Sequence, residues 1–225
     1  MADPVLVLRP EPGAARTAEA LRAAGFLPIL YPLYEIEPVE WTSPDPAGIA
    51  ALLVTSANAV RQAGPGMARF LSKPLFAVGE ATATAARQAG FHSVQVGGGD
   101  IASTVPVMVA AGLGPVLHLS GTEIRAFDPA GLSILRIPVY RSAPQGSAEG
   151  LAHAVPRDRG AFALVHSPRA GVRLAELVTQ EERERITIVA ISEAASEACG
   201  SGWRDRVVAG APTGQAMLAG LQMLV

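Results

Sequence analysis

The sequence is poor in cysteine, and its histidines are few and scattered. Cys199 is the single cysteine among the 225 residues, so the chain can form neither an internal disulfide framework nor a cysteine-ligated metal site. The four histidines show no ligand-like spacing to acids or to that cysteine. We therefore expect a protein that holds no metal ion.

Long apolar runs and an excess of charge are also absent. No stretch approaches the roughly 20 apolar residues that a membrane-spanning helix needs. Residues 1–12 carry two acids and no apolar segment followed by a cleavage site, which favours a cytoplasmic protein. A net charge of −2 gives no overall attraction to nucleic acid. Lys73 is the single lysine among 18 Lys and Arg residues, which reflects either genomic base composition or the suitability of planar guanidinium groups for carboxylates.

The motifs of common nucleotide sites and of serine nucleophiles are missing as well. Gly97–Gly99 precede a predicted helix, but neither GxGxxG nor GxxxxGK[ST] occurs. No GxSxG elbow surrounds the serines at predicted strand ends, which are Ser56, Ser120, Ser167 and Ser192. These absences argue against a dinucleotide cofactor and against catalysis by a serine nucleophile.

What the chain does contain is an α/β pattern that is written twice. The stretch ALLVTSANAVR at 51–61 is echoed by AFALVHSPR at 161–169, and FAVGEA at 76–81 is echoed by VAISEA at 189–194. Each is an apolar run that ends where a helical pattern begins, as is typical of buried parallel strands. The sequence therefore predicts two α/β halves.

Strands and helices alternate along the chain. Strands are predicted at 5–9, 27–31, 51–55, 75–78, 94–96, 115–119, 135–140, 161–166, 186–191 and 206–209. Helices are predicted at 14–24, 58–71 with a break at 64–66, 80–89, 101–111, 148–155, 168–179, 193–199 and 213–224. Gly25 and Gly90 suit the left-handed position that follows a helix.

Polar residues concentrate where the predicted strands end. The residues at these positions are Ser56, Gly79, Ser120, Ser167 and Ser192. Helix N-termini offer free N–H groups and partial positive charge, which favour anions. With Arg9, Arg125, Arg141 and Arg169 nearby in the sequence, these positions suit a ligand that carries many carboxylates. Each serine taken alone equally suits a helix cap, and each arginine a solvated surface.

Two extended stretches marked by proline connect the halves. They are Tyr31–Val39 and Ile137–Arg141, and their prolines disfavour helix. Tyr140 lies on the second stretch. Its hydroxyl could donate a proton to a reacting group, although a tyrosine at a strand end also suits a packing role.

Seven segments carry a resemblance to a known family. They are RPEPGAARTAEALRAAGF (9–26), PLYEIEP (32–38), LLVTSANAV (52–60), FAVGEATATAARQAGF (76–91), HLSGTEIR (118–125), PVYRSAP (138–144) and VHSPRAGVRLAEL (165–177). In the order and spacing of these segments, the sequence resembles the uroporphyrinogen-III synthase family over its whole length.

This resemblance implies an α/β fold of two Rossmann-like (flavodoxin-like) lobes with parallel sheets, joined by a two-stranded linker. One lobe would be discontinuous, 1–35 plus 144–225, and the other would be 38–138. The linker strands would be 31–39 and 137–143. The repeats alone suggest two contiguous lobes, whereas the family's exchange of elements explains why both proline-marked stretches are extended.

The resemblance also implies an activity, that of a cyclising hydro-lyase in haem, cobalamin and chlorophyll biosynthesis. The family closes hydroxymethylbilane, a linear tetrapyrrole with eight carboxylates, into uroporphyrinogen III with inversion of ring D and loss of water. The steps are loss of the terminal hydroxyl to give an azafulvene, attack to give a spiro intermediate, then fragmentation and reclosure. Free hydroxymethylbilane closes by itself to isomer I, so the enzyme must fold its substrate, which requires no metal or organic cofactor.

The resemblance assigns roles to individual residues. Tyr140 matches the family's tyrosine in the second linker and would be the general acid for the departing hydroxyl. Substrate binding is assigned to Thr55, Ser56, Gly79, Glu80, Ala81, Ser120, Gly121, Ser167, Ser192 and Ala194, and the charge argument adds Arg9 and Arg125. Glu80 and Glu193 put negative charge where a substrate carboxylate is expected, so backbone N–H groups are the predicted contacts at those two turns.

Two rival functions remain open. One is a two-lobed binding protein that closes on an anionic small molecule and does no chemistry. The other is a sugar-nucleotide or NAD enzyme on a similar fold, which the missing glycine fingerprint disfavours. For the synthase we expect a monomer whose partner is hydroxymethylbilane, with no nucleic acid, no membrane and at most a transient contact with the upstream deaminase.

Overall fold

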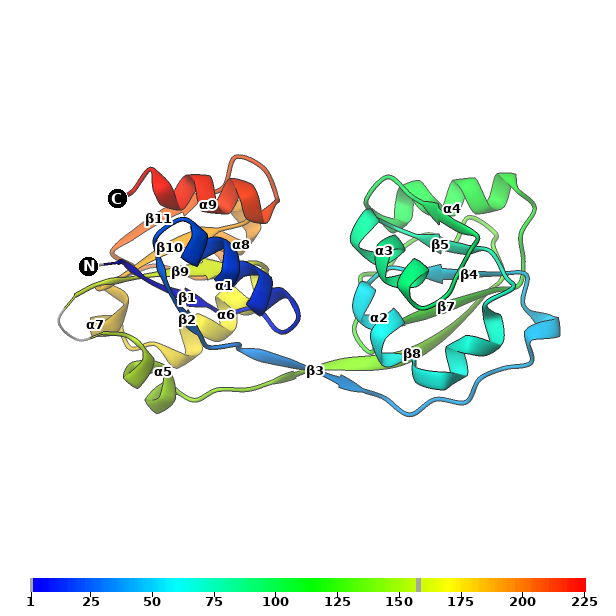
Figure 1. The fold of residues 1–225 in the computed structure, drawn as a ribbon, viewed down its shortest axis with the longest axis horizontal. Coiled ribbons are helices and arrows are strands. Elements are labelled where there is room, and N and C mark those ends of the chain that lie inside the picture. Colours follow the sequence, from blue (N-terminus) through cyan, green and yellow to red (C-terminus); the bar gives the residue numbers. More distant parts are fainter. Residues whose placement is uncertain (1, 157–158) are drawn as a thin grey trace. The chain divides into compact units, whose positions relative to one another are not determined.

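The computed structural model describes residues 2–156 and 159–225 and divides into two compact α/β units. Unit 1 combines Met1–Glu35 with Ala143–Val225, and unit 2 is Ile36–Ser142. The chain therefore leaves unit 1, builds unit 2 and returns. In Figure 1, unit 1 contains both the blue N-terminal segment and the yellow to red C-terminal segment.

Unit 1 is built on a five-stranded parallel sheet in the order β11-β10-β9-β1-β2. The strands are β1 (Pro4–Val7), β2 (Leu27–Leu30), β9 (Ala161–Val165), β10 (Ile186–Ala190) and β11 (Asp205–Val208). Every residue of β1 and β10 is buried, and all of them except Thr187 are apolar. Such largely apolar runs are typical of strands that have helices on both faces.

The helices of unit 1 cover both faces of this sheet. They are α1 (Gly13–Ala23), α5 (Ala148–Ala154), α6 (Pro168–Leu177), α7 (Gln180–Arg183), α8 (Glu193–Glu197) and α9 (Gly214–Gln222). Strand β1 shows the division, because successive side chains of a strand point to opposite faces. Val5 belongs to the core cluster of α1 and α9, and Leu6 to that of α5, α6 and α8.

Unit 2 has a six-stranded sheet in the order β3-β8-β7-β4-β5-β6, parallel from β8 to β6. The strands are β3 (Tyr34–Pro38), β4 (Ala51–Val54), β5 (Leu75–Ala77), β6 (Val94–Val96), β7 (Val116–Gly121) and β8 (Ile134–Pro144). The first two residues of β3 and the last two of β8 belong to unit 1. The helices are α2 (Ala57–Gln62), α3 (Glu80–Gln88) and α4 (Ile101–Ala110), with 3-10 turns η1 (Pro46–Gly48) and η2 (Gly64–Phe70). Leu52 packs with α2 and α3 on one face, and Leu53 packs with α4 on the other.

The predicted α/β class with parallel sheets is confirmed. Gly25 and Gly90 follow α1 and α3 with φ of 87° and 98°, the left-handed conformation that was expected. The predicted helix at 58–71 is divided, since α2 ends at Gln62 and a 3-10 segment begins at Gly64. β8 is longer than the predicted strand, because the proline-marked connector continues it. None of the described helices has both the length and the apolar character needed to cross a membrane.

Candidate functional site

In unit 1 the predicted site residues lie at the carboxyl ends of neighbouring strands. β1, β9 and β10 are adjacent and parallel, so the residues that follow them share one edge of the sheet. Arg9 follows β1, Ser167 follows β9, and Ser192 with the exposed Ala194 follows β10. In open α/β sheets this edge is where ligands bind.

Two serines of this edge are already used as helix caps. The Ser167 hydroxyl accepts a hydrogen bond from the N–H of Ala170 at 3.2 Å, and the Ser192 hydroxyl accepts one from the N–H of Ala195 at 3.3 Å. The side chains therefore fix the first turns of α6 and α8. Each serine accepts through its oxygen and keeps its O–H proton, so the hydroxyls as well as the remaining backbone N–H groups of those turns are donors available to an anion.

Arg9 is the charged group at this edge. It is half-buried, and its guanidinium lies against Gly13, where a Cβ would force it to shift. Burial, and secondarily the charge of Arg16, lower its pKa. Among the described residues Arg9 forms no ion pair or hydrogen bond. A half-buried cation with no protein partner suits an anionic ligand.

His166 adjoins Arg9 and is electrically neutral near pH 7. Burial, followed by the charge of Arg9, lowers the pKa of His166 to about 4. The sequence showed His166 only as one of four scattered histidines. Its neutrality comes from the tertiary fold, and leaves Arg9 as the positive charge of this strand end.

In unit 2 the helices that follow β4 and β5 differ in how their N-termini are capped. The Ser56 hydroxyl accepts from the N–H of Asn58 at 3.1 Å and caps α2, and Thr55 beside it is half-buried. No side chain caps α3, which begins after Gly79. The exposed Glu80 carboxylate instead accepts from Arg87 at 2.6 Å. The first turn of α3 therefore keeps free backbone donors at Glu80 and Ala81.

Ser120 is placed differently from what its strand-end position suggests. Its side chain is fully buried, accepts from Nε of Arg136 at 3.0 Å and donates to the carbonyl of Gly121 at 2.9 Å. The hydroxyl of Ser120 is therefore a structural group beneath the turn and is not presented to a ligand. Arg125 lies on the exposed loop between β7 and β8.

Tyr140 lies on β8 directly opposite Gly121 of β7, next to a register shift between Ser120 and Gly121. The N–H of Thr122 donates to the carbonyl of Tyr140 at 2.9 Å. A Cβ at Gly121 would lie 2.9 Å from Cζ and 3.1 Å from Oη of Tyr140, so the phenol rests on the glycine backbone. The half-buried phenol hydroxyl forms no hydrogen bond with any described residue, which leaves it free to donate a proton.

Two further arginines that the sequence placed near strand ends have protein partners. Arg141 forms an ion pair with Glu37 at 2.7 Å in unit 2. The guanidinium of Arg169 lies 4.5 Å from the ring centroid of Tyr34 in unit 1, as a cation–π contact. Arg9 therefore remains the better placed of these arginines to meet a carboxylate.

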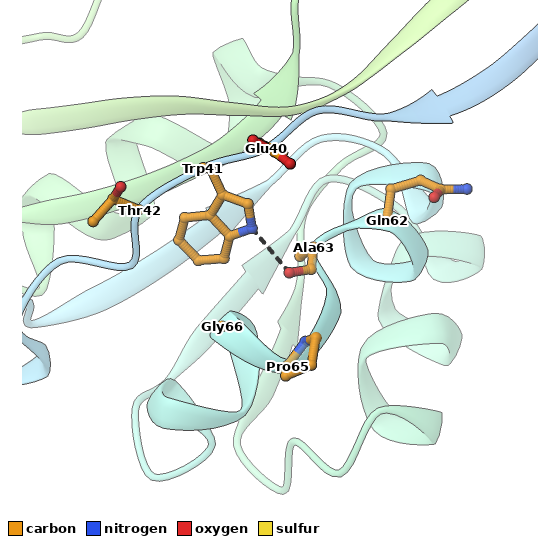
Figure 2. A pocket seen from close by; sticks show the side chains of 7 residues that line it. All are labelled: Glu40, Trp41, Thr42, Gln62, Ala63, Pro65 and Gly66. Carbon is orange, nitrogen blue, oxygen red and sulfur yellow. Dashed lines mark hydrogen bonds between the residues drawn. The ribbon is translucent and has the colours of Figure 1, made fainter.

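Two pockets in the described part of the chain lie away from the predicted residues. A pocket of about 600 Å³ in unit 2 lies between Glu40–Thr42 and the turn at Ala63–Gly66, where Nε1 of Trp41 donates to the carbonyl of Ala63 at 2.9 Å (Figure 2). A pocket of about 570 Å³ in unit 1 lies at the amino ends of β9, β10 and β11. Within residues 2–156 and 159–225 no group of three or more His, Cys, Asp or Glu side chains could hold a metal ion.

Comparisons with known proteins agree on one family. The family model described as uroporphyrinogen-III synthase HemD matches residues 15–219. The structure of uroporphyrinogen-III synthetase from Helicobacter pylori 26695 is 18% identical, with a TM-score of 0.72 over 100% of both chains. A mutant uroporphyrinogen III synthase from the extremely thermophilic bacterium Thermus thermophilus is 20% identical, with a TM-score of 0.54 over 99% of this chain and 98% of that chain. A search of curated proteins found no match.

The structural similarities at these identities establish the shared two-lobed α/β fold. The family model extends over nearly the whole chain and so carries the assignment. The chain belongs to the uroporphyrinogen-III synthase (HemD) family, a family of cyclising lyases of tetrapyrrole biosynthesis.

Proposed function

We propose that this protein cyclises hydroxymethylbilane to uroporphyrinogen III with inversion of ring D and release of one water. The observation that carries the proposal is the match of the family model to residues 15–219. Neither a metal nor an organic cofactor takes part. The protein holds the two ends of the substrate in a reactive geometry, so that closure with inversion is faster than the spontaneous closure to isomer I. Such positioning lowers an activation free energy by several kcal/mol.

Tyr140 is the general acid in this proposal. Its hydroxyl gives a proton to the terminal hydroxyl of the substrate. The C–O bond then breaks, water departs, and the substrate becomes an electrophilic azafulvene. Attack through the substituted position of ring D, fragmentation of the spiro intermediate and reclosure then give the inverted ring. The ring proton released in the last step restores the hydroxyl of Tyr140, so the net loss is one water. The unpaired phenol hydroxyl above Gly121 supports this role.

The carboxylates of the substrate are held by the strand-end groups of each unit. Arg9 supplies a half-buried positive charge in unit 1, with the first turns of α6 and α8 after Ser167 and Ser192. In unit 2 the uncapped first turn of α3 supplies backbone donors after Gly79, and Thr55 and Ser56 flank it from β4. Carboxylates suit such positions because helix N-termini favour anions.

The same proposal includes the division of the chain into lobes, the cellular location and the oligomeric state. The lobes are 1–35 plus 144–225 and 38–138, with 31–39 and 137–143 as linker strands. The protein acts in the cytoplasm as a monomer, and any contact with the upstream deaminase is transient.

The first test is a coupled assay of the porphyrin isomers. Hydroxymethylbilane is generated in place by its deaminase, this protein is added, the products are oxidised, and isomers I and III are separated by chromatography. We expect mostly isomer III with the protein and isomer I without it. Isomer I alone in the presence of folded protein would refute the synthase assignment and favour a two-lobed binding protein for an anionic small molecule.

Gly121→Ala is expected to lower kcat in this assay by up to roughly 100-fold, because the new Cβ displaces the phenol of Tyr140 by about an ångström. The backbone of Gly121 does not have a positive φ, so alanine adds no backbone strain there. Gly48→Ala is the matched control in unit 2, since nothing lies within 4 Å of the added Cβ there. Equal kcat for both variants would show that the contact of Tyr140 with Gly121 does not matter to the reaction.

A further inference from the structure

Arg136 of β8 is bonded to the turn at the end of β7 by three hydrogen bonds. Nε donates to the hydroxyl of Ser120 at 3.0 Å. Nη2 donates to the carbonyl of Gly121 at 2.8 Å and to the carbonyl of Thr122 at 2.8 Å. One planar guanidinium therefore fixes three consecutive residues, which the single ammonium of a lysine cannot do in the same geometry.

The turn needs such donors because the ladder between β7 and β8 is irregular there. The register shifts between Ser120 and Gly121. At an irregularity of this kind the regular pairing is interrupted, and backbone carbonyls need other partners. Gly121 is buried, so leaving its carbonyl unpaired would cost free energy. Arg136 and the Ser120 hydroxyl both donate to it.

The same turn supports Tyr140. The phenol rests on Gly121, and the N–H of Thr122 holds the carbonyl of Tyr140 at 2.9 Å. Any movement of Gly121 or Thr122 therefore moves the phenol hydroxyl. Arg136 precedes Tyr140 on β8 and is linked to its phenol through this turn.

We propose that Arg136 is a positioning residue for the proposed reaction: it fixes the Ser120–Thr122 turn and thereby the place of the Tyr140 hydroxyl. It touches no reacting atom. The inference rests on the proposed function and on the acid role of Tyr140, and it assigns to Arg136 a part that neither its sequence position nor any comparison gives it.

The test uses Arg136→Lys and Arg136→Ala in the coupled isomer assay, with Arg69→Lys as the matched control. Arg69 also lies in unit 2 and also donates to a backbone carbonyl, that of Ser43 at 3.3 Å. We expect both Arg136 variants to lower kcat by about 10- to 100-fold with KM within about twofold, since a misplaced catalytic group costs rate rather than binding. The share of isomer I should rise in parallel, and Arg69→Lys should behave as wild type.

Added guanidinium ion separates positioning from a loss of folded protein. At millimolar concentration it should restore part of the kcat of Arg136→Ala and none of that of Tyr140→Phe. Wild-type kcat in Arg136→Lys, or a loss in both variants that only follows the folded fraction measured by circular dichroism, would overturn the inference. Wild-type protein that yields only isomer I would instead refute the proposed function itself, so the two failures are distinguishable.

Discussion

Replacing Tyr140 by phenylalanine is expected to lower kcat by roughly 10²- to 10⁴-fold, the range of a lost general acid, while the protein folds as before. The change removes one hydroxyl that has no hydrogen-bond partner among the described residues, and it keeps the ring that packs on Gly121. KM should change little, because the proton is transferred only as the hydroxyl of the substrate leaves. The coupled isomer assay, with oxidation and separation of isomers I and III, measures the effect.

Tyr31→Phe is the matched control, since it makes the same chemical change in unit 1. The Tyr31 hydroxyl donates to the carbonyl of Ser147 and accepts from the N–H of Ser147, both at 2.9 Å. Its loss should cost about 1 kcal/mol of stability and leave kcat unchanged. Unchanged turnover in Tyr140→Phe would remove Tyr140 from the mechanism, whatever the control shows.

Local pattern was enough to predict most of the fold. Largely apolar runs predicted β4 and β10 because strands with helices on both faces need few polar residues. Gly25 and Gly90 marked helix ends because few other residues adopt a positive φ. The length of β8 was not predictable, because Pro144 resembles a connector proline and the pairing with β7 ends at Tyr140, so the remainder of the strand has only β3 as its neighbour in the sheet.

The site was less predictable, because its chemistry depends on contacts between distant residues. Ser120 occupies a strand end like Ser167, but only the register of β7 with β8 shows that its hydroxyl is covered by Arg136. The sequence likewise places both Arg9 and Arg141 near strand ends, whereas in the structure Arg141 is paired with Glu37 and Arg9 is not paired with any described residue. That Ser56 caps α2 was foreseeable from its residue type and its position.

Acidification from pH 7 to pH 5 is expected to lower the free energy of unfolding of each unit by roughly 2 kcal/mol through its buried histidine. In unit 2, burial and then Arg136 lower the pKa of His118 to about 4, and in unit 1 burial and then Arg9 do the same for His166. An unfolded histidine binds its proton near pH 6.5. Between pH 6.5 and 4 the unfolded chain therefore binds protons that the folded chain does not, so stability that is full above pH 6.5 is lost as the pH falls.

His118→Leu isolates this effect in unit 2. His118 is 1% exposed, and neither ring nitrogen has a hydrogen-bond partner among the described residues, so leucine should stabilise unit 2 by about 1 kcal/mol at pH 7. The substitution should also remove the decrease in the free energy of unfolding that His118 causes in that unit on acidification. The two tryptophans report the units separately in urea titrations: Trp41 reports unit 2 in a Trp203→Phe background, and Trp203 reports unit 1 in a Trp41→Phe background. The free energy of unfolding reported by Trp203 should still decrease on acidification, because His166 is unchanged. If the free energy reported by Trp41 decreases as much as in the wild type, His118 is not the source of the decrease in unit 2.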